Sequence, residues 1–412
     1  MRLMSTIKGH RWVVAAFVAA LLAMSACSSD SDAGGGADTT TTASTTAAPG
    51  AGAPEVDPTE AAFELPDGRL DEVKAAGLTF EEVEYPTQPD GVPWPTEEWA
   101  TGELPEGVDP DEVQGIVDRA FGELSTDGQT IDAILVVKDG RLVVEEYNDW
   151  DPDATHMSWS MAKSITSSLI GILVGQGRLD ITEPVAAPEW SERGDPRAGI
   201  TLDHLLRMSS GLEWDENYTD PNGDVLVTLG GGADRAGYVA SKPLVDEPGA
   251  RWYYSSGTSN LIARSVAEDV GYGEDLTDWI GQALFEPLGI GEVEHSLDAT
   301  GLISGGSWIN LSPRDFARFG LLYARNGIWD GRRILPEGWV DYSRMPTPSG
   351  TDRYGAQWWL DPERPTMFYA SGFNGQTINV FPEDDLVVVV LSNTPEGRDG
   401  EVRQALFDAF GV

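Results

Sequence analysis

A serine and a lysine stand three residues apart at the start of an apolar segment, MSWSMAKSITSSLIGILVGQG, which spans residues 157–177. Its apolar residues recur at helical spacing and predict a helix that begins near Ser160 and ends at Gly175. Because residues three apart lie on the same side of a helix, Ser160 and Lys163 are expected to face together. The free N–H groups and positive dipole of a helix N-terminus would stabilise an oxyanion beside them.

This pairing could turn a poor nucleophile into a good one. Burial disfavours the ammonium form of Lys163, and an uncharged amine can accept the proton of Ser160. The alternative is a solvated lysine in a first helical turn, which is disfavoured because cations are stabilised at the other end of a helix. Since Ser-x-x-Lys alone is a common pattern, a second motif is needed to distinguish a catalytic pair from a solvated lysine.

That motif is PGARWYYSSGTSNLI at residues 248–262, where a Pro-Gly turn leads to Tyr254, Ser255 and Ser256. Together with SMAKS at 160–164, it resembles the motifs of the penicillin-recognising serine hydrolases. These include class C β-lactamases and DD-peptidases. The motifs most resemble those of the related esterases and 6-aminohexanoate-dimer hydrolases. Further similar stretches are ITLDHLLRMSSGL at 200–212, FEPLGI at 285–290 and SGGSWINLSPRDFARFG at 304–320. The resemblance covers about residues 130–410.

The resemblance implies a role for each matching residue. Ser160 would be the acyl-accepting nucleophile, and Lys163 its partner with a lowered pKa. Tyr254 would carry the proton, with Ser256 in the Asn place of the family's Tyr-x-Asn motif. A tyrosine can do this only if positive charge lowers its pKa, and protonated Lys163 would supply that charge. The two groups would then titrate as a pair.

The family's third motif, Lys-Thr/Ser-Gly, is best matched by Ala370-Ser371-Gly372, followed by Phe373. The backbone N–H of Phe373 would face that of Ser160 and complete an oxyanion hole. Ala370 stands in the Lys place, so a substrate carboxylate would lose a charge-assisted hydrogen bond worth about 1.5–3 kcal/mol. Neutral esters or amides are therefore expected as substrates, rather than β-lactams or D-Ala-D-Ala peptides.

The remaining patterns predict an α+β fold. Two apolar runs within 131–147 are joined by an Asp-Gly hairpin signal, and helices are expected over 109–124 and about 400–410. Further strands are expected near the C-terminus, at YGAQWWL (354–360), TMFYA (366–370), GQTINVF (375–381) and DLVVVVLSN (385–393). We expect an antiparallel sheet flanked by helices, formed from about 105–180 and 346–412. A mostly helical lobe, about 181–345, would be inserted into it. Trp358 and Trp359 must point to opposite faces of their strand, one into the core and the other toward the substrate.

The N-terminus is expected to direct export. A basic start and an apolar run within residues 1–27 end at Cys27, the only cysteine, which resembles the lipidation site of a bacterial lipoprotein. An ordinary secretory signal is the alternative. Residues 28–57, rich in Ser, Thr, Ala and Gly, predict a flexible tether, so that 58–412 form the hydrolase domain and contact the membrane only through the lipid anchor.

Composition excludes several partners. The chain of 412 residues has a net charge of −41, which would repel nucleic acid. Four dispersed histidines make a zinc site improbable, and neither metal nor organic cofactor is expected. His156 precedes Ser160 without an obvious carboxylate to orient it, His204 reads as a structural helix residue, and His295 could line the cleft.

Two rival functions stay open. One is a β-lactamase or DD-peptidase that acts on cell-wall material. The other is a surface module that binds such material without catalysis, although such a module has no need of Ser160, Lys163 and Tyr254 together. The acyl group, the leaving group and the oligomeric state are not specified by the sequence.

Overall fold

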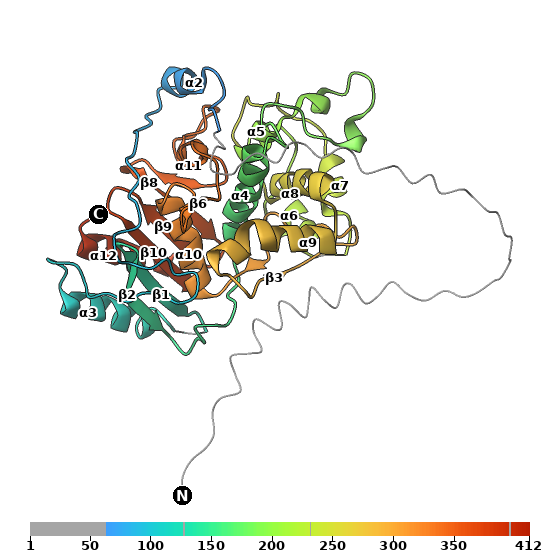
Figure 1. Cartoon of the computed structure of the whole chain (residues 1–412). Coiled ribbons are helices and arrows are strands. Elements are labelled where there is room, and N and C mark those ends of the chain that lie inside the picture. The colour runs from blue at the N-terminus through green and yellow to red at the C-terminus, as the bar shows by residue number, and fades with distance from the viewer. Residues whose placement is uncertain (1–62, 127, 231, 395–396) are drawn as a thin grey trace, which may run out of the picture. The chain divides into compact units, whose positions relative to one another are not determined.

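The computed structural model describes residues 63–126, 128–230, 232–394 and 397–412 (Figure 1). The predicted signal segment with Cys27, the whole of the predicted tether (28–57) and the first residues of the predicted hydrolase domain (58–62) lie outside these ranges. The fold is built on a six-stranded antiparallel sheet with the strand order β2-β1-β10-β9-β8-β7. The sheet therefore joins strands from both ends of the domain, as the α+β prediction requires.

The strands of this sheet follow the predicted apolar runs, except that β7 begins only at the end of the run 354–360. They are β1 (Ile131–Lys138), β2 (Arg141–Tyr147), β7 (Trp359–Asp361), β8 (Arg364–Gly372), β9 (Gln376–Phe381) and β10 (Leu386–Ser392). The β1–β2 turn has Asp139 at φ 50° and Gly140 at φ 71°, the left-handed pair that an Asp-Gly hairpin requires. Two small hairpins stand apart from the sheet: β3 (Glu294–His295) with β4 (Ile309–Asn310), and β5 (Ile328–Trp329) with β6 (Arg332–Arg333).

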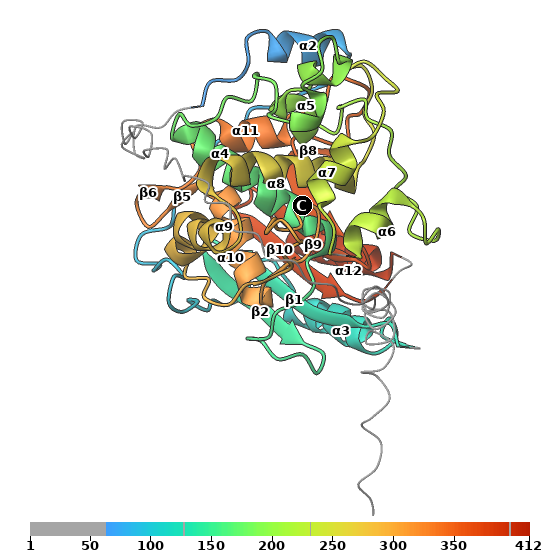
Figure 2. The same cartoon turned by 90° about the vertical axis from the view of Figure 1, so that its right-hand side faces the viewer.

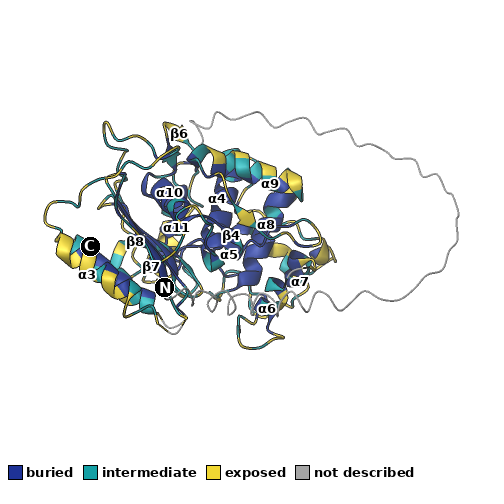
Figure 3. Ribbon diagram, turned by 90° about the horizontal axis from the view of Figure 1, so that it is seen from below, coloured by how far each residue is buried: buried dark blue, intermediate teal, exposed yellow. Residues whose placement is uncertain are grey.

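Helices cover both faces of the sheet. On one face lie α3 (Pro110–Phe121) and α12 (Arg398–Phe410), which pack on alternate residues of β1 such as Ile134 and Val136. On the other lies α10 (Pro313–Ala324), against the residues between them, including Leu135. Figure 3 shows α3 buried along one side and exposed along the other. This two-sided cover explains why β10, LVVVVLS, is apolar at nearly every position.

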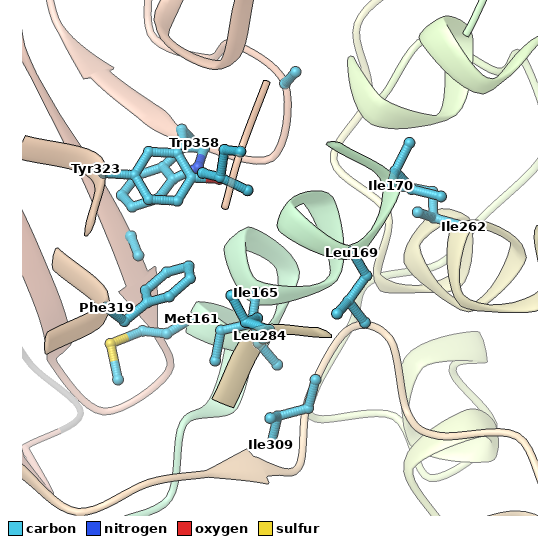
Figure 4. Close-up of a cluster of buried hydrophobic side chains, with 14 of the residues drawn as sticks. Met161, Ile165, Leu169, Ile170, Ile262, Leu284, Ile309, Phe319, Tyr323 and Trp358 are labelled. Atoms are coloured by element: carbon cyan, nitrogen blue, oxygen red, sulfur yellow. The ribbon is translucent and has the colours of Figure 1, made fainter. Parts of the chain in front are cut away.

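The segment that carries Ser160 leads into a helix that is buried within the domain along most of its length. Trp159–Met161 form a 3₁₀ turn, and α4 (Ala162–Gly175) continues from it. The helix packs on α8 (Ser256–Val270). Figure 4 shows side chains of the turn and of α4 among apolar residues of α8, α10, β4 and neighbouring turns; the labelled residues are Met161, Ile165, Leu169, Ile170, Ile262, Leu284, Ile309, Phe319, Tyr323 and Trp358. The predicted helix is confirmed, with its first turn tightened.

Shorter helices complete the domain. They are α2 (Arg69–Ala75), α5 (Leu202–Leu206), α6 (Asp224–Leu229), α7 (Arg235–Ala240), α9 (Glu274–Ile280) and α11 (Trp339–Arg344). As Figures 1 and 2 show, α2 lies at the opposite end of the domain from α3. The segment before α3 runs along the domain surface, where Phe63 packs on Trp339 and Trp94 on Trp329. Within the described ranges, no helix has the length and apolarity needed to cross a membrane.

Candidate active site

Ser160 lies on the 3₁₀ turn that precedes α4. The backbone of this turn is strained, and the end of β8 packs against it. Trp159 has φ 43°, a left-handed conformation that bulky residues rarely adopt. Ser158 N–H donates to Asn310 Oδ1 over 2.9 Å, which fixes the start of the turn. A Cβ at Gly372 would come within 2.5 Å of Ser158 O. Only glycine therefore lets the end of β8 approach the turn that presents the nucleophile.

Lys163 is buried with its amine against the Ser160 hydroxyl. Its Nζ lies 2.9 Å from Ser160 Oγ, 3.0 Å from Ser256 Oγ and 3.0 Å from the carbonyl oxygen of Gly306. The side chain is only 2% exposed. Burial lowers the pKa of Lys163 to about 8, although the nearby charge of Glu216 acts to raise it. A sizeable fraction of the amine is thus uncharged just above neutral pH, as the sequence predicts.

The Gly305-Gly306 pair brings a loop onto α8 beside this amine. A Cβ at Gly305 would come within 2.1 Å of Ser259 O, and one at Gly306 within 2.9 Å of Ser256 O. Both contacts are far closer than a Cβ tolerates, so both positions require glycine. The close approach lets the Gly306 carbonyl accept a hydrogen bond from Lys163. This part of the site lies in the family-like stretch 304–320, although the sequence alone gave Gly306 no role.

Tyr254 lies over the amine, in a group of aromatic rings. Its ring centroid is 5.1 Å from Lys163 Nζ and 5.3 Å from that of Trp359, on which it stacks. Trp358 is fully buried, which confirms that one of the two tryptophans belongs to the core, although it lies just before β7 and not on the strand. That Trp359 faces the substrate stays a prediction.

The expectation of a lowered Tyr254 pKa is wrong. Burial raises the pKa of this phenol well above its ordinary value, and the Tyr354 and Glu216 charges add to the effect. Only the neighbouring Ser160 side chain opposes the rise. Tyr254 is therefore a neutral hydrogen-bond donor near the nucleophile, and Lys163 is the group with a pKa suited to a base.

Glu216 belongs to the site and was missed in the sequence. Its Oε1 accepts from Ser256 Oγ over 2.5 Å and from the Tyr218 hydroxyl over 2.9 Å. Its Oε2 accepts from the Ser256 backbone N–H over 2.8 Å and from Trp214 Nε1. Ser256, the residue in the family's Asn place, thus links this carboxylate to Lys163. Among 68 acidic residues, nothing local distinguishes Glu216.

The third motif lies where the resemblance predicts. Gly372 ends β8 beside the nucleophile's turn, preceded by Ser371, and the exposed Phe373 follows it. The Phe373 ring meets Trp159 edge-on at 5.4 Å and stacks on Tyr218 at 5.0 Å. Ala370, in the family's Lys place, is buried. That the N–H groups of Ser160 and Phe373 form an oxyanion hole stays a prediction.

The histidines stand apart from this chemistry. His156 Nε2 lies 2.9 Å from Asp132 Oδ2, so the expectation that it has no carboxylate partner is wrong; the pair is buried and joins β1 to the segment before Ser160. His204 forms a capping box with Thr201 at the start of α5, the structural role predicted for it. Burial lowers the pKa of the half-buried His295. Among the described residues, no group of three or more His, Cys, Asp or Glu could hold a metal ion.

The profile of the Beta-lactamase family matches residues 117–410. A 6-aminohexanoate-dimer hydrolase of Paenarthrobacter ureafaciens is 26% identical over 291 residues, which are 64% of this chain and 73% of the relative.

Solved structures share the fold. A putative 6-aminohexanoate-dimer hydrolase from Bacillus anthracis is 22% identical, with a TM-score of 0.59 over 76% of this chain and 87% of that one. A putative beta-lactamase from Bacteroides dorei DSM 17855 is 18% identical, with a TM-score of 0.61 over 74% and 100%. The resemblance inferred from the motifs is confirmed: the chain belongs to the beta-lactamase family and is a serine hydrolase.

Proposed function

We propose that the protein hydrolyses a neutral ester or amide through an acyl intermediate on Ser160. The observation that carries the proposal is the buried Lys163 amine, 2.9 Å from Ser160 Oγ, with its pKa lowered to about 8. As Ser160 Oγ attacks the carbonyl carbon, its proton passes to the uncharged amine. The N–H groups of Ser160 and Phe373 would stabilise the oxyanion that forms.

The second half of the reaction returns the site to its starting state. The leaving group departs with a proton, either from the Lys163 ammonium or through the Tyr254 phenol, which the amine's proton replenishes. A water molecule then attacks the acyl carbon and gives its proton to Lys163. Cleavage of the bond to Ser160 Oγ releases the acid, and the proton returns to the serine. Tyr254 acts here as a neutral donor, in keeping with its raised pKa.

The charges and rings of the site favour neutral substrates. Ala370 is buried where the penicillin-binding members have a lysine, and the Glu216 carboxylate lies one serine away from the catalytic amine. A substrate carboxylate would meet repulsion here instead of a cation. The half-buried Trp159 and exposed Phe373 offer apolar surface beside Ser160. The relative's name, 6-aminohexanoate-dimer hydrolase, supports an amide among the candidate substrates.

Labelling with a fluorophosphonate probe tests the nucleophile. The folded wild-type protein should be labelled, and Ser160→Ala should abolish labelling. Ser164→Ala is a matched control, because Ser164 is a buried serine of α4, four residues after Ser160, and its hydroxyl donates to Gln357 O. A folded wild-type protein that takes no label would favour the non-catalytic binding module. Labelling that survives in Ser160→Ala would show that Ser160 is not the nucleophile.

A substrate screen tests the substrate class. Short p-nitrophenyl esters and short neutral amides should be turned over faster than nitrocefin, because a β-lactam carboxylate has no matching cation in the site. Nitrocefin turnover at rates typical of a β-lactamase would instead favour the cell-wall alternative.

We also propose that the protein is exported and anchored by a lipid on Cys27. The basic residues Arg2, Lys8 and Arg11, the apolar run and the single cysteine support this. In a bacterial host, wild-type protein should incorporate radiolabelled palmitate and sediment with membranes, and Cys27→Ser should do neither. Export of wild-type protein without label would favour an ordinary secretory signal.

A further inference from the structure

We infer that Glu216 is a positioning residue: by fixing the hydrogen of the Ser256 hydroxyl, it aims the lone pair of uncharged Lys163 at Ser160. The inference rests on the proposed function, because it concerns how the base of that reaction is oriented. It gives a role to a carboxylate that belongs to none of the three motifs. Its basis is an unbroken line of contacts from Glu216 through Ser256 and Lys163 to Ser160.

The Ser256 hydroxyl is the link between Glu216 and Lys163. A hydroxyl has one hydrogen to donate, and Ser256 Oγ lies 2.5 Å from Glu216 Oε1, which can only accept. The carboxylate therefore takes that hydrogen. Glu216 is itself held by Tyr218, Trp214 and the Ser256 backbone N–H, so it is not free to turn away. With its hydrogen committed, Ser256 Oγ can face Lys163 only as an acceptor.

The hydrogen bond from Ser256 to Glu216 determines how the amine of Lys163 is oriented. An uncharged lysine keeps two N–H bonds and one lone pair, and Lys163 Nζ has three oxygen neighbours at 2.9–3.0 Å. Ser256 Oγ and the Gly306 carbonyl are both acceptors, so each takes one N–H. The lone pair is left for the third neighbour, Ser160 Oγ, whose hydrogen it can accept. Without Glu216, Ser256 could donate its own hydrogen to the lone pair and leave the amine turned away from the nucleophile.

The same arrangement also accommodates the protonated form of Lys163. When Ser160 loses its proton, Lys163 becomes an ammonium with three N–H bonds, directed at Ser256, Gly306 and the serine oxygen or substrate. The negative charge of Glu216 favours that ammonium, against the burial that disfavours it. The other titratable groups near the amine are the phenols of Tyr254, Tyr218 and Tyr354, and burial raises the pKa of all three.

Two kinetic readouts separate this role from a merely structural one. The rate of fluorophosphonate labelling is measured against pH, and the labelled fraction gives the concentration of folded sites. In Glu216→Gln, loss of the carboxylate charge lowers the Lys163 pKa. The pH at which the labelling rate falls on acidification, which is the acid limb of the pH–rate profile, should therefore move down by about one unit. The plateau rate above that limb should fall by about tenfold, because the amide no longer fixes the Ser256 hydrogen.

A double-mutant cycle tests the path through Ser256. Ser256→Ala should lower the plateau rate by about tenfold, and adding Glu216→Gln should lower it little further. Glu213→Gln is the matched control, since Glu213 is an exposed carboxylate three residues away on the same loop, and it should leave both readouts unchanged. If Glu216→Gln does not fold, the plateau labelling rate of Ser256→Ala still tests the path through Ser256, because the proposal requires that rate to fall by about tenfold.

The outcomes distinguish the two proposals. A wild-type protein that is labelled on Ser160, with an unmoved acid limb in Glu216→Gln or additive effects in the cycle, overturns the role of Glu216 and leaves the proposed function standing. A wild-type plateau rate in Ser256→Ala does the same. A folded wild-type protein without labelling overturns both.

Discussion

At the scale of the residue, activity depends on one amine that must lose its charge. The pKa of Lys163 is lowered to about 8, so the uncharged form is present above that pH and is lost as the pH falls. We therefore predict that kcat/KM for a neutral ester declines by about tenfold for each pH unit below the pKa of Lys163. The rate is measured from pH 5 to 9 in a buffer series of constant ionic strength. A profile that stays flat down to pH 5 would contradict the role of Lys163 as base.

The sequence found some residues of the site and not others, for physical reasons. Ser160 and Lys163 are paired by helical geometry within one turn, which spacing alone reveals. The raised pKa of Tyr254 depends on burial among rings such as Trp359, which follows it by more than a hundred residues. Glu216 reaches Ser256 only because the loop after α5 folds back onto the start of α8. No local pattern reports such tertiary contacts.

At the scale of the element, β8 and the turn around Ser160 must touch without an intervening side chain. A Cβ at Gly372 would lie 2.5 Å from Ser158 O and 3.0 Å from Trp159 Cβ. We predict that Gly372→Ala pushes β8 from the turn by several tenths of an ångström and lowers kcat/KM by about 10–100-fold, because small misplacements of reacting groups are costly. Steady-state kinetics on a neutral ester measure this effect.

Gly115→Ala provides the matched control for that substitution. Gly115 lies within α3, and a Cβ there would meet nothing within 4 Å. Replacing it should leave kcat/KM unchanged and stabilise the fold by up to about 1 kcal/mol, because alanine is the better helix former. Wild-type kcat/KM in Gly372→Ala would show that the close approach of β8 is not needed for catalysis.

The elements themselves follow from the sequence more fully than their tertiary contacts do. The β1–β2 hairpin, α3, α12 and the strands β8 to β10 lie where apolar periodicity and turn residues predict them. The segment 354–360 is strand only at its end, where β7 begins at Trp359, because the chain bends at Ala356 and Gln357, where Gln357 has φ 64°. Tyr354 pairs with Trp359 only through an isolated bridge. The helix α10 packs on the sheet, although its sequence lies in the range expected to be a helical lobe.

At the scale of the whole molecule, the charge of −41 sets the response to salt. Self-repulsion among so many carboxylates destabilises the compact state, and dissolved salt screens it. We predict that the melting temperature rises between 10 mM and 1 M NaCl and that KCl has the same effect, because screening depends on ionic strength. Differential scanning fluorimetry measures it. A melting temperature that falls or stays constant would show that local ion pairs outweigh the overall repulsion.

The central claim, an acyl group carried on Ser160, is tested most directly by mass spectrometry during turnover. The protein is mixed with a p-nitrophenyl ester, quenched in acid within one turnover time, and digested for peptide mapping. The account predicts that intact protein gains the mass of the acyl group and that the adduct lies on Ser160, with none in Ser160→Ala. An adduct confined to another residue, or undiminished ester turnover by Ser160→Ala, would contradict it.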